Sequence, residues 1–178
     1  YFGVGWTKVY LEKMCEFYSK IGDTKYTAIR HSNIYGPHDK YDLDKSHFFG
    51  ATITKVLQAR DKRIVVWGDG SEERDLLYVS DLVDFVEVIL KKQKDSFELI
   101  NIGLGKSFPV KDVVGKIIQI SGKKIKLEFD TSKPTIKFNL AVNIERARKK
   151  YNFRPKTSLE KGIKKTISWY KQSFLEKK

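Results

Sequence analysis

Short apolar runs of strand length alternate with longer segments of helical period along nearly the whole chain. The strand-like runs are residues 26–30, 64–67, 76–79, 99–102, a short stretch near 108, and 124–129. The helix-like segments are residues 9–21, 47–59, 81–90, 110–121, 144–151 and 159–174. Strands that alternate with helices predict an α/β fold, and the last third of the chain is typical of a small separate lobe rather than of more doubly wound sheet.

Two serines stand where helices are expected to begin. Ser80 precedes the helical segment 81–90, and Ser158 precedes the segment 159–174. A serine at this position can accept a hydrogen bond from a backbone N–H of the first helical turn, so both are predicted N-caps. Residues 31–45 are expected to form a loop.

A glycine-rich phosphate-binding loop is missing from the sequence. No Gly-x-Gly-x-x-Gly or Gly-x-x-Gly-x-x-Gly follows a strand-like run, and such a loop usually cradles the diphosphate of a dinucleotide. The chain also begins at Tyr1, without Met and inside what reads as a motif. We therefore expect a fragment of a longer protein whose dinucleotide-binding residues lie outside these 178 residues.

Positive charge is concentrated in the second half of the chain. Residues 1–90 carry 12 Lys and Arg against 14 Asp and Glu, whereas residues 91–178 carry 23 against 8. A field of this sign attracts an anion such as a sugar diphosphate, or nucleic acid, although a solvated lysine-rich face gives the same count. No recognised nucleic-acid motif accompanies the charge, so specific nucleic-acid binding is not expected.

The sequence gives no sign of a membrane segment or a signal peptide. No window of eighteen apolar residues occurs, and the N-terminal residues lack the basic-then-apolar pattern of a signal peptide. We expect a soluble, cytoplasmic protein that does not bind a membrane.

The single cysteine and the largest aromatic residues are expected to be structural. Cys15 excludes an internal disulfide framework, and its helical spacing within residues 9–21 predicts a place in the core. Trp67, Trp169 and Tyr170 could stack on a nucleotide base. Their positions in a strand and on an amphipathic helix favour core packing instead.

Four stretches, in a fixed order, carry a resemblance to a known family. They are Lys8-x-x-x-Glu12, Arg30-His31-Ser32-Asn33-Ile34-Tyr35-Gly36-Pro37, Val66-Trp67-Gly68-Asp69-Gly70 through Arg74-Asp75, and Lys133-Pro134 before Thr157-Ser158-Leu159-Glu160-Lys161-Gly162. With the closing stretch 166–170, they resemble the extended short-chain dehydrogenase/reductases. Within these the chain is most similar to the NAD-dependent nucleotide-sugar epimerase/dehydratase family, of the GDP-fucose synthase type.

The resemblance implies how the chain divides. Residues 1–95 would be the C-terminal portion of a Rossmann-like dinucleotide-binding domain, with the catalytic helix and interleaved substrate-lobe elements. Residues 96–178 would be mainly a small α/β lobe that binds the nucleotide sugar. NAD or NADP would be bound mainly by an N-terminal domain, and relatives commonly form homodimers through the helix that begins here near Gly5.

The resemblance also implies a catalytic tyrosine and lysine in the pattern Tyr-x-x-x-Lys. In such a pair the ammonium group and the cofactor lower the pKa of the phenol toward neutrality. Lys8 fits the lysine, for catalysis and cofactor binding, but Val4 stands in the tyrosine position. Tyr1 shares the helix face of Lys8 but lies about 10 Å away along the axis, so it serves only if the first turn is distorted. Otherwise another residue acts, or the protein binds without catalysing.

Four further residues match functional positions of the family. His47 matches a histidine that protonates the sugar, and the alternative is a histidine that only begins a helix. Asn33, Arg74 and Lys133 match contacts to the sugar diphosphate. Asn33 could instead bond to its own loop, and Arg74 could form an ion pair with a neighbouring carboxylate.

The leading hypothesis is an NAD(P)-dependent nucleotide-sugar epimerase, dehydratase or reductase on a route to surface polysaccharide, whose C-terminal portion alone is inactive. The alternative is a non-catalytic nucleotide-sugar-binding member of the same fold, which Val4 motivates. The sequence leaves open the sugar, the nucleotide base, the direction of reaction and the choice between NAD and NADP.

Overall fold

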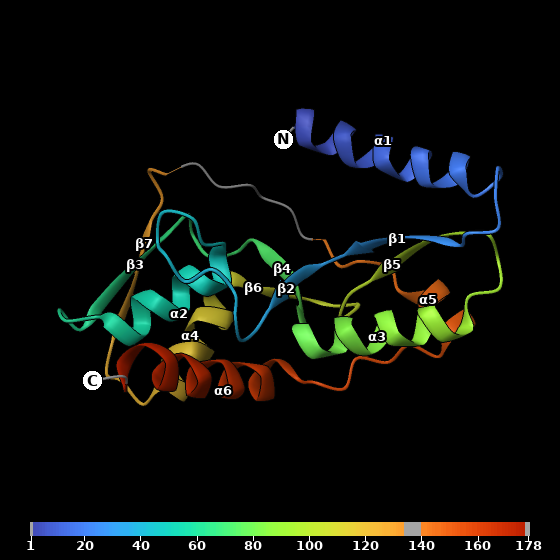
Figure 1. The fold of residues 1–178 in the computed structure, drawn as a ribbon. Helices are drawn as coiled ribbons and strands as arrows, with labels where there is room; N and C mark the ends of the chain where they lie inside the picture. Colours follow the sequence, from blue (N-terminus) through green and yellow to red (C-terminus); the bar gives the residue numbers. More distant parts are fainter. Residues whose placement is uncertain (1, 134–139, 177–178) are drawn as a thin grey trace.

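The computed structural model describes residues 2–133 and 140–176. Its elements, in chain order, are α1 (Phe2–Tyr18), β1 (Tyr26–His31), β2 (Asn33–Tyr35), α2 (Phe48–Gln58), β3 (Arg63–Trp67), β4 (Glu73–Tyr78), α3 (Val79–Lys92), β5 (Phe97–Ile102), β6 (Ser107–Pro109), α4 (Val110–Ser121), β7 (Lys126–Asp130), α5 (Glu145–Tyr151), α6 (Leu159–Tyr170) and the π-helical turn η1 (Lys171–Leu175). Strands and helices alternate, so the predicted α/β class is confirmed (Figure 1).

Most of the strand pairing is parallel. β1 pairs with β5, β2 with β4, and β3 with β7, all in parallel, while β6 is antiparallel to β4. In Figure 1, α1 lies along one side of the β1–β5 pair and α3 along the other. Parallel strands joined through helices are the arrangement of a Rossmann-type sheet.

The chain changes strand partner at Ser32. This residue alone separates β1 from β2, and the chain leaves β5 there to pair with β4. The loop predicted for residues 31–45 is therefore wrong at its start, because β2 occupies Asn33–Tyr35. In open α/β sheets, such a change of neighbour leaves a crevice where a ligand can bind.

Two clusters of buried side chains form the core. One joins α2, α4 and α6 through residues such as Ile53, Val113 and Ile163, each 0 % exposed. The other joins α3, α5 and β5 through Phe85 and Ile100, each 1 % exposed. Each cluster draws on segments far apart in the sequence. The division of the chain at residues 95 and 96 stays a prediction.

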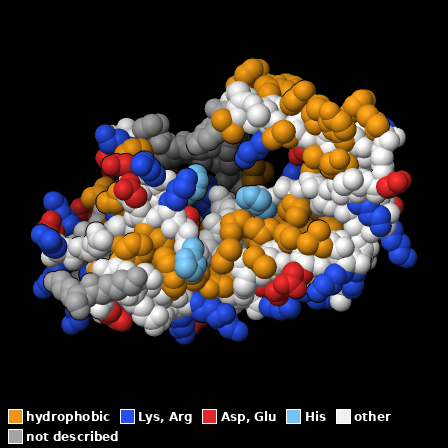
Figure 2. Space-filling view, viewed as in Figure 1, with side chains coloured by type: hydrophobic (Ala, Val, Ile, Leu, Met, Phe, Trp, Pro, Cys, Tyr) orange, Lys and Arg blue, Asp and Glu red, His pale blue; other side chains and the backbone are white. Residues whose placement is uncertain are grey.

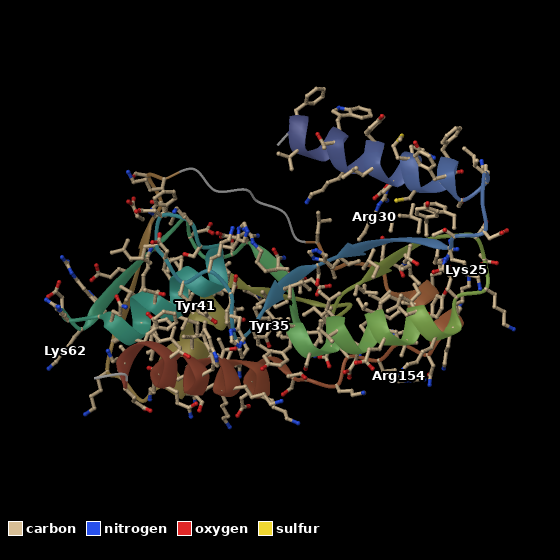
Figure 3. The ribbon with its side chains drawn as sticks, in the orientation of Figure 1. Lys25, Arg30, Tyr35, Tyr41, Lys62 and Arg154 are labelled. Carbon is tan, nitrogen blue, oxygen red and sulfur yellow. The ribbon has the colours of Figure 1, made fainter. Side chains whose placement is uncertain are left out.

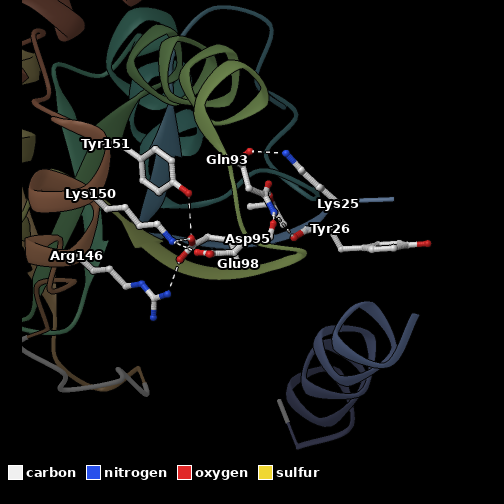
Figure 4. Close-up of polar contacts among 9 residues, drawn as sticks. Lys25, Tyr26, Gln93, Asp95, Glu98, Arg146, Lys150 and Tyr151 are labelled. Carbon is white, nitrogen blue, oxygen red and sulfur yellow. Dashed lines mark hydrogen bonds and ion pairs between the residues drawn. The ribbon is translucent and has the colours of Figure 1, made fainter. Parts of the chain in front are cut away.

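A charged cluster fastens α5 to β5 (Figure 4). Glu98, 0 % exposed, accepts a hydrogen bond of 2.9 Å from the hydroxyl of Tyr151 and forms ion pairs with Lys150 and with Arg146, the latter at 2.6 Å. Hydrogen bonds to Asp95 and Glu98 raise the pKa of Lys150. A buried carboxylate with these partners holds the last third of the chain on the parallel strands.

The expected core position of Cys15 is wrong. None of the described residues of α1 is buried, and Cys15 is half-buried. The apolar side chains of α1 are largely exposed, with Phe2 at 83 % and Trp6 at 61 %. The described strands β1 and β5 cover this apolar stripe only in part, leaving Met14 and Cys15 half-buried.

The predictions for two helix caps and three aromatic residues are confirmed in part. Ser158 accepts a hydrogen bond from the N–H of Lys161 at the start of α6, as predicted. Ser80 is not a cap, because α3 already begins at Val79. The burial of Trp169 and Tyr170 against the core is confirmed. The predicted core position of Trp67 is wrong, because this residue is 57 % exposed.

No helix in residues 2–133 and 140–176 is long and apolar enough to cross a membrane.

Candidate functional site

A cleft of about 660 Å³ opens where β1 gives way to β2. We call it the first cleft. It is lined by Lys8 from α1, residues 31–39, His47, Phe48 and Phe49, Asp75, Leu76 and Val79, and Leu140 and Val142. Figure 2 shows histidine side chains on this face of the molecule, below the apolar surface of α1. The first cleft therefore contains three of the predicted site residues: Lys8, Asn33 and His47.

Lys8 reaches the first cleft because α1 is tied to β1. Arg30 donates two hydrogen bonds to the carboxylate of Glu12, one turn after Lys8, at 2.7 and 2.5 Å. This interaction lowers the pKa of Glu12. In Figure 3, Arg30 lies between α1 and β1. The ammonium group of Lys8 is exposed to solvent and to the cleft.

His47 stands at the mouth of the first cleft. It is the N-cap residue of α2, but its side chain makes no capping hydrogen bond. His47 is exposed and begins α2, as the alternative expected, but its side chain does not cap the helix. His47 is therefore available to a ligand in the cleft, and its role in proton transfer stays a prediction.

Two histidines to which the sequence assigned no role also line the first cleft. A ring nitrogen of His31 lies 2.8 Å from the carbonyl oxygen of Ser32. His38 has a left-handed backbone, with φ of 65°, and its ring centroid lies 4.8 Å from that of Trp169. Both histidines line the first cleft because the chain changes strand partner at Ser32. The sequence predicted a loop over residues 31–45 and therefore did not indicate this change.

Asn33 bonds to the backbone rather than to a side chain. Its amide group donates to the carbonyl oxygen of Asp75, 3.0 Å away on the adjacent strand β4. Asn33 remains exposed and lines the first cleft, so its amide oxygen is still free to accept a hydrogen bond.

The carboxylate of Asp75 organises the floor of the first cleft. Asp75 is 1 % exposed. It accepts backbone hydrogen bonds from Leu104 at 2.8 Å, Gly105 at 3.2 Å and Val142 at 3.1 Å. Asp75 thus joins β4, the turn after β5 and the segment around Val142. Charged acceptors with several backbone donors make strong local anchors.

Arg74 lies in a second cleft of about 450 Å³. The second cleft is lined by Leu43, Ser46, Phe48, Ala51, Thr52, Lys55, Ile64, Val66, Trp67, Glu72, Arg74 and Val110. Phe48 borders both clefts. Arg74 donates to the carbonyl oxygen of Glu73 at 2.9 Å. Within the described residues it forms no ion pair with Glu72 or Asp75, so its charge is available to a ligand.

The structure places none of three other positions from the sequence analysis in either cleft. Lys133 is exposed just after β7 and lines neither cleft, so its contact to the diphosphate stays a prediction. Tyr1 lies outside the described residues. Val4 is 59 % exposed on α1.

Tyr35 does not replace the missing tyrosine, although it lines the first cleft. Its hydroxyl faces the carbonyl oxygen of Leu159 at 3.5 Å, and burial raises the pKa of its phenol. In Figure 3, Tyr35 and Tyr41 lie in the interior of the molecule. A buried phenol with a raised pKa is a poor proton-transfer group near neutral pH.

The turn after β5 does not provide a cradle for a dinucleotide diphosphate. Gly103 and Gly105 follow a parallel strand, as such a loop would, but Asp75 already accepts from the backbone N–H groups of Leu104 and Gly105. A phosphate needs those N–H groups free. Of this chain's residues, Lys8 alone was predicted to contact the cofactor.

A protein-family comparison matches residues 5–103 to the model described as the NAD dependent epimerase/dehydratase family. This match covers the first cleft's residues from Lys8 to Val79, together with Arg74 in the second cleft. The chain belongs to the NAD-dependent epimerase/dehydratase family. The predicted resemblance is confirmed.

Relatives of this epimerase/dehydratase chain support the same assignment. It is 35 % identical over 157 residues to GDP-L-fucose synthase of Sinorhizobium fredii, covering 86 % of this chain and 49 % of that protein. Among solved structures, UDP-glucose 4-epimerase of Thermotoga maritima with UDP-glucose gives a TM-score of 0.80 at 25 % identity, covering 90 % and 50 % of the two chains. UDP-glucuronic acid 4-epimerase of Bacillus cereus, in complex with UDP-glucuronic acid and NAD, gives 0.75 at 28 % identity and the same coverage.

The chain spans about half the length of the relatives it matches. These structures share its Rossmann-type arrangement of parallel strands and helices, as the sequence predicted.

Proposed function

We propose that this chain is the part of an NAD(P)-dependent nucleotide-sugar epimerase, dehydratase or reductase that holds the sugar nucleotide. The observation that carries the proposal is the pair of clefts that meet at Phe48. The first cleft would take the sugar, and the second cleft would take the nucleotide. A sugar nucleotide has these two parts joined by a diphosphate, so its length suits two adjoining clefts.

Cations near the second cleft suit the diphosphate. Arg74 and Lys55 both line it, and a guanidinium can bind phosphate oxygens through two parallel hydrogen bonds. The ammonium of Lys55 now lies 3.4 Å from the carbonyl oxygen of Val65, a weak contact that a phosphate could replace. Arg74 is the predicted diphosphate residue.

Polar groups in the first cleft suit the sugar. Asn33 can accept a hydrogen bond from a sugar hydroxyl while its NH₂ group remains on Asp75. The imidazole of His47 lines the same cleft and has ring nitrogens that can exchange a proton with a sugar carbon or oxygen. Lys8 adds a positive charge from α1 on the opposite wall.

NAD or NADP would be bound mainly by residues outside this chain. Supporting this, the amides after β5 are already bonded to Asp75, and the chain spans about half of each relative. The chain by itself would therefore be inactive, because Lys8 alone would not hold a nicotinamide close to the sugar. The complete protein would act in the cytoplasm, on a route to surface polysaccharide.

A homodimer through α1 is part of the proposal. The helix carries exposed apolar residues, including Phe2, Trp6 and Tyr10, of which the last two are each 61 % exposed. Contiguous apolar surface of this kind marks an interaction site on a soluble protein. Light scattering of the full-length protein would give twice the monomer mass, and W6E would reduce it to the monomer mass.

The experiment that tests the function uses the full-length protein with NAD or NADP and a panel of GDP-, UDP- and dTDP-sugars, with products identified by NMR. Conversion of at least one sugar supports the proposal, and no conversion of any contradicts the enzyme assignment. R74A should weaken nucleotide-sugar binding. The matched control is R63A, because Arg63 is an exposed arginine on β3 that lies outside both clefts and pairs with Glu128 at 4.0 Å.

A second candidate is a nucleotide-sugar-binding protein without catalysis. It is favoured by Val4, which cannot transfer a proton from the position where the family pattern has tyrosine. This candidate predicts tight binding of a nucleotide sugar with no product after prolonged incubation with either cofactor. The panel assay, combined with calorimetry on the same sample, separates the two.

A further inference from the structure

One proton-transfer position of the family pattern is not filled by this chain. Val4 stands where the pattern has tyrosine, and its side chain has no proton to exchange. Tyr35 is a poor substitute, because burial raises the pKa of its phenol. If the complete protein is an enzyme, another side chain of the first cleft must exchange this proton.

His31 lies at the end of β1, in the first cleft. It is the last residue of that strand, and it lines the cleft together with Lys8. Because β1 runs parallel to β5, His31 stands at the carboxyl end of parallel strands, where open α/β sheets bind their ligands. His31 is exposed, so a sugar in the first cleft can reach it.

A backbone contact fixes which ring nitrogen of His31 carries the hydrogen. Nδ1 lies 2.8 Å from the carbonyl oxygen of Ser32. A carbonyl oxygen only accepts hydrogen bonds, so Nδ1 is the donor in this contact and carries the hydrogen. In the neutral ring the other nitrogen, Nε2, is then unprotonated. Nε2 of His31 is therefore a proton acceptor.

The carbonyl group that orients His31 is itself held in place. The N–H of Ser32 donates to the carbonyl oxygen of Ile102 at 2.9 Å, and Ser32 is 8 % exposed. The next residue, Asn33, begins β2 and pairs with Leu76 of β4. Sheet structure thus fixes the chain on both sides of this carbonyl group. A histidine oriented through Nδ1, with Nε2 unprotonated, is the arrangement that takes a proton from a hydroxyl group.

Four other ionisable side chains of the first cleft are less suited to accept the proton. Asp75 is buried, and its carboxylate accepts three backbone hydrogen bonds. Asp39 accepts from a backbone N–H at 2.7 Å. The ring of His38 packs on that of Trp169, with the centroids 4.8 Å apart. The ammonium group of Lys8 has donors only.

We propose that His31 is the catalytic base for a hydroxyl group of the sugar, and the acid in the reverse direction, in place of the tyrosine of the family pattern. The O–H bond of the sugar breaks and an N–H bond forms at Nε2, so His31 becomes an imidazolium and the carbon becomes a ketone. The hydride that leaves this carbon needs a two-electron acceptor, which is oxidised NAD or NADP bound by the complete protein. This inference rests on the proposed function, since it requires a sugar in the first cleft.

The first test is independent of activity. It is ¹⁵N NMR of the full-length protein labelled at its histidine ring nitrogens, with H31Q used to assign the signals of His31. In the neutral ring the hydrogen should be on Nδ1, and Nε2 should have the chemical shift of an unprotonated nitrogen. A hydrogen on Nε2 overturns the inference, because His31 would then present a donor instead of a base.

The second test is kinetic, with the sugar that the wild type converts from the panel of GDP-, UDP- and dTDP-sugars. H31Q should lower kcat by about 10²–10⁴ and leave the Kd of the nucleotide sugar unchanged. Added imidazole should raise the kcat of H31A in proportion to its concentration, because the free base can replace the missing ring. The controls are the wild type, which imidazole should not activate, and S71A, which lies outside both clefts and should keep the wild-type kcat.

The outcomes separate this inference from the proposed function. An unchanged kcat in H31Q overturns the role of His31 and leaves the function standing. A loss of kcat in H31A that imidazole does not restore assigns His31 a structural role and overturns the inference as well. Conversion of no panel sugar by the wild type overturns the proposed function, and the inference with it.

Discussion

Glu12 in α1 and Arg30 in β1 are joined by a two-pronged contact, with both guanidinium hydrogen bonds ending on one carboxylate at 2.7 and 2.5 Å. This contact joins a helix with no buried described residue to the parallel strands. Lys8 lies on the same helix and lines the first cleft. The position of Lys8 over the cleft thus depends on a polar contact rather than on a shared core.

E12Q should loosen α1. Because Arg30 is half exposed, the loss of unfolding free energy should be modest, about 0.5 kcal/mol at neutral pH. Hydrogen exchange should nevertheless speed up at the amides of α1. E16Q is the control, since the ion pairs of Glu16 within the described residues are with Lys13 on the same helix and with Lys20 just after it. Equal exchange rates in α1 for E12Q and the wild type would contradict this role.

The same contact predicts a pH dependence. Arg30 lowers the pKa of Glu12 in the folded protein. A carboxylate with a depressed folded pKa stabilises the protein above its unfolded pKa, about 4.3, and that contribution is lost as the pH falls through the folded value. The difference in exchange between E12Q and the wild type should therefore be full at pH 6 and should shrink below pH 4.

D75N should disrupt the floor of the first cleft. The substitution turns one acceptor into an NH₂ group that faces backbone donors of Leu104, Gly105 and Val142. Unfolding in urea should show a loss of about 2–4 kcal/mol, the range for breaking a buried charged network. D112N, at an exposed position of α4, should change stability by less than about 0.5 kcal/mol. A small effect of D75N would mean that the three backbone groups find other partners.

G162A should destabilise α6 by overpacking. A Cβ at Gly162 would lie 2.1 Å from the hydroxyl oxygen of Tyr35, which is 1 % exposed. The expected loss of unfolding free energy is about 1–3 kcal/mol. G115A in α4 has open space for the new methyl group and should be neutral or stabilising, by up to about 1 kcal/mol. If both variants were equally stable, Tyr35 would have room that the structure does not give it.

H47N should separate chemistry from binding. His47 is exposed and makes no capping bond, and asparagine is a good N-cap residue, so H47N should not lower the stability. If His47 transfers a proton, kcat should fall by about 10²–10⁴ with little change in the affinity for the sugar nucleotide. The control is S71A, because Ser71 is exposed and lies outside both clefts. S46A is unsuitable, because Ser46 lines the second cleft. An unchanged kcat in H47N would exclude His47 from the chemistry.

Local periodicity predicted the elements well where each element is covered within the chain. The helix expected over residues 110–121 is α4 with the same bounds. Periodicity failed where burial depends on the surroundings. The apolar stripe of α1 predicts that one helix face is covered, but not by which element. Cys15 was therefore expected in the core, whereas none of the described residues of α1 is buried. Trp67 lies on a strand with alternating burial, and alternation alone does not say which face is open.

The site was predicted in part. Motif positions indicated Lys8, Asn33 and His47, and the structure brings them into one cleft. The sequence did not indicate that Asp75 ties three segments together, because its partners are backbone groups 29 to 67 residues away. Nor did it indicate that Glu72 is buried, with no hydrogen-bond partner for its Oε2 atom among the described residues, because burial depends on the packing of the chain.

The most direct test of the account is the crystal structure of the full-length protein with NAD or NADP and a nucleoside diphosphate. The account predicts difference density in the second cleft, with the diphosphate against Arg74 and the base against Trp67, and an opening toward His47 for the sugar. Density for the nucleotide at another surface, with the second cleft occupied only by solvent, would contradict it.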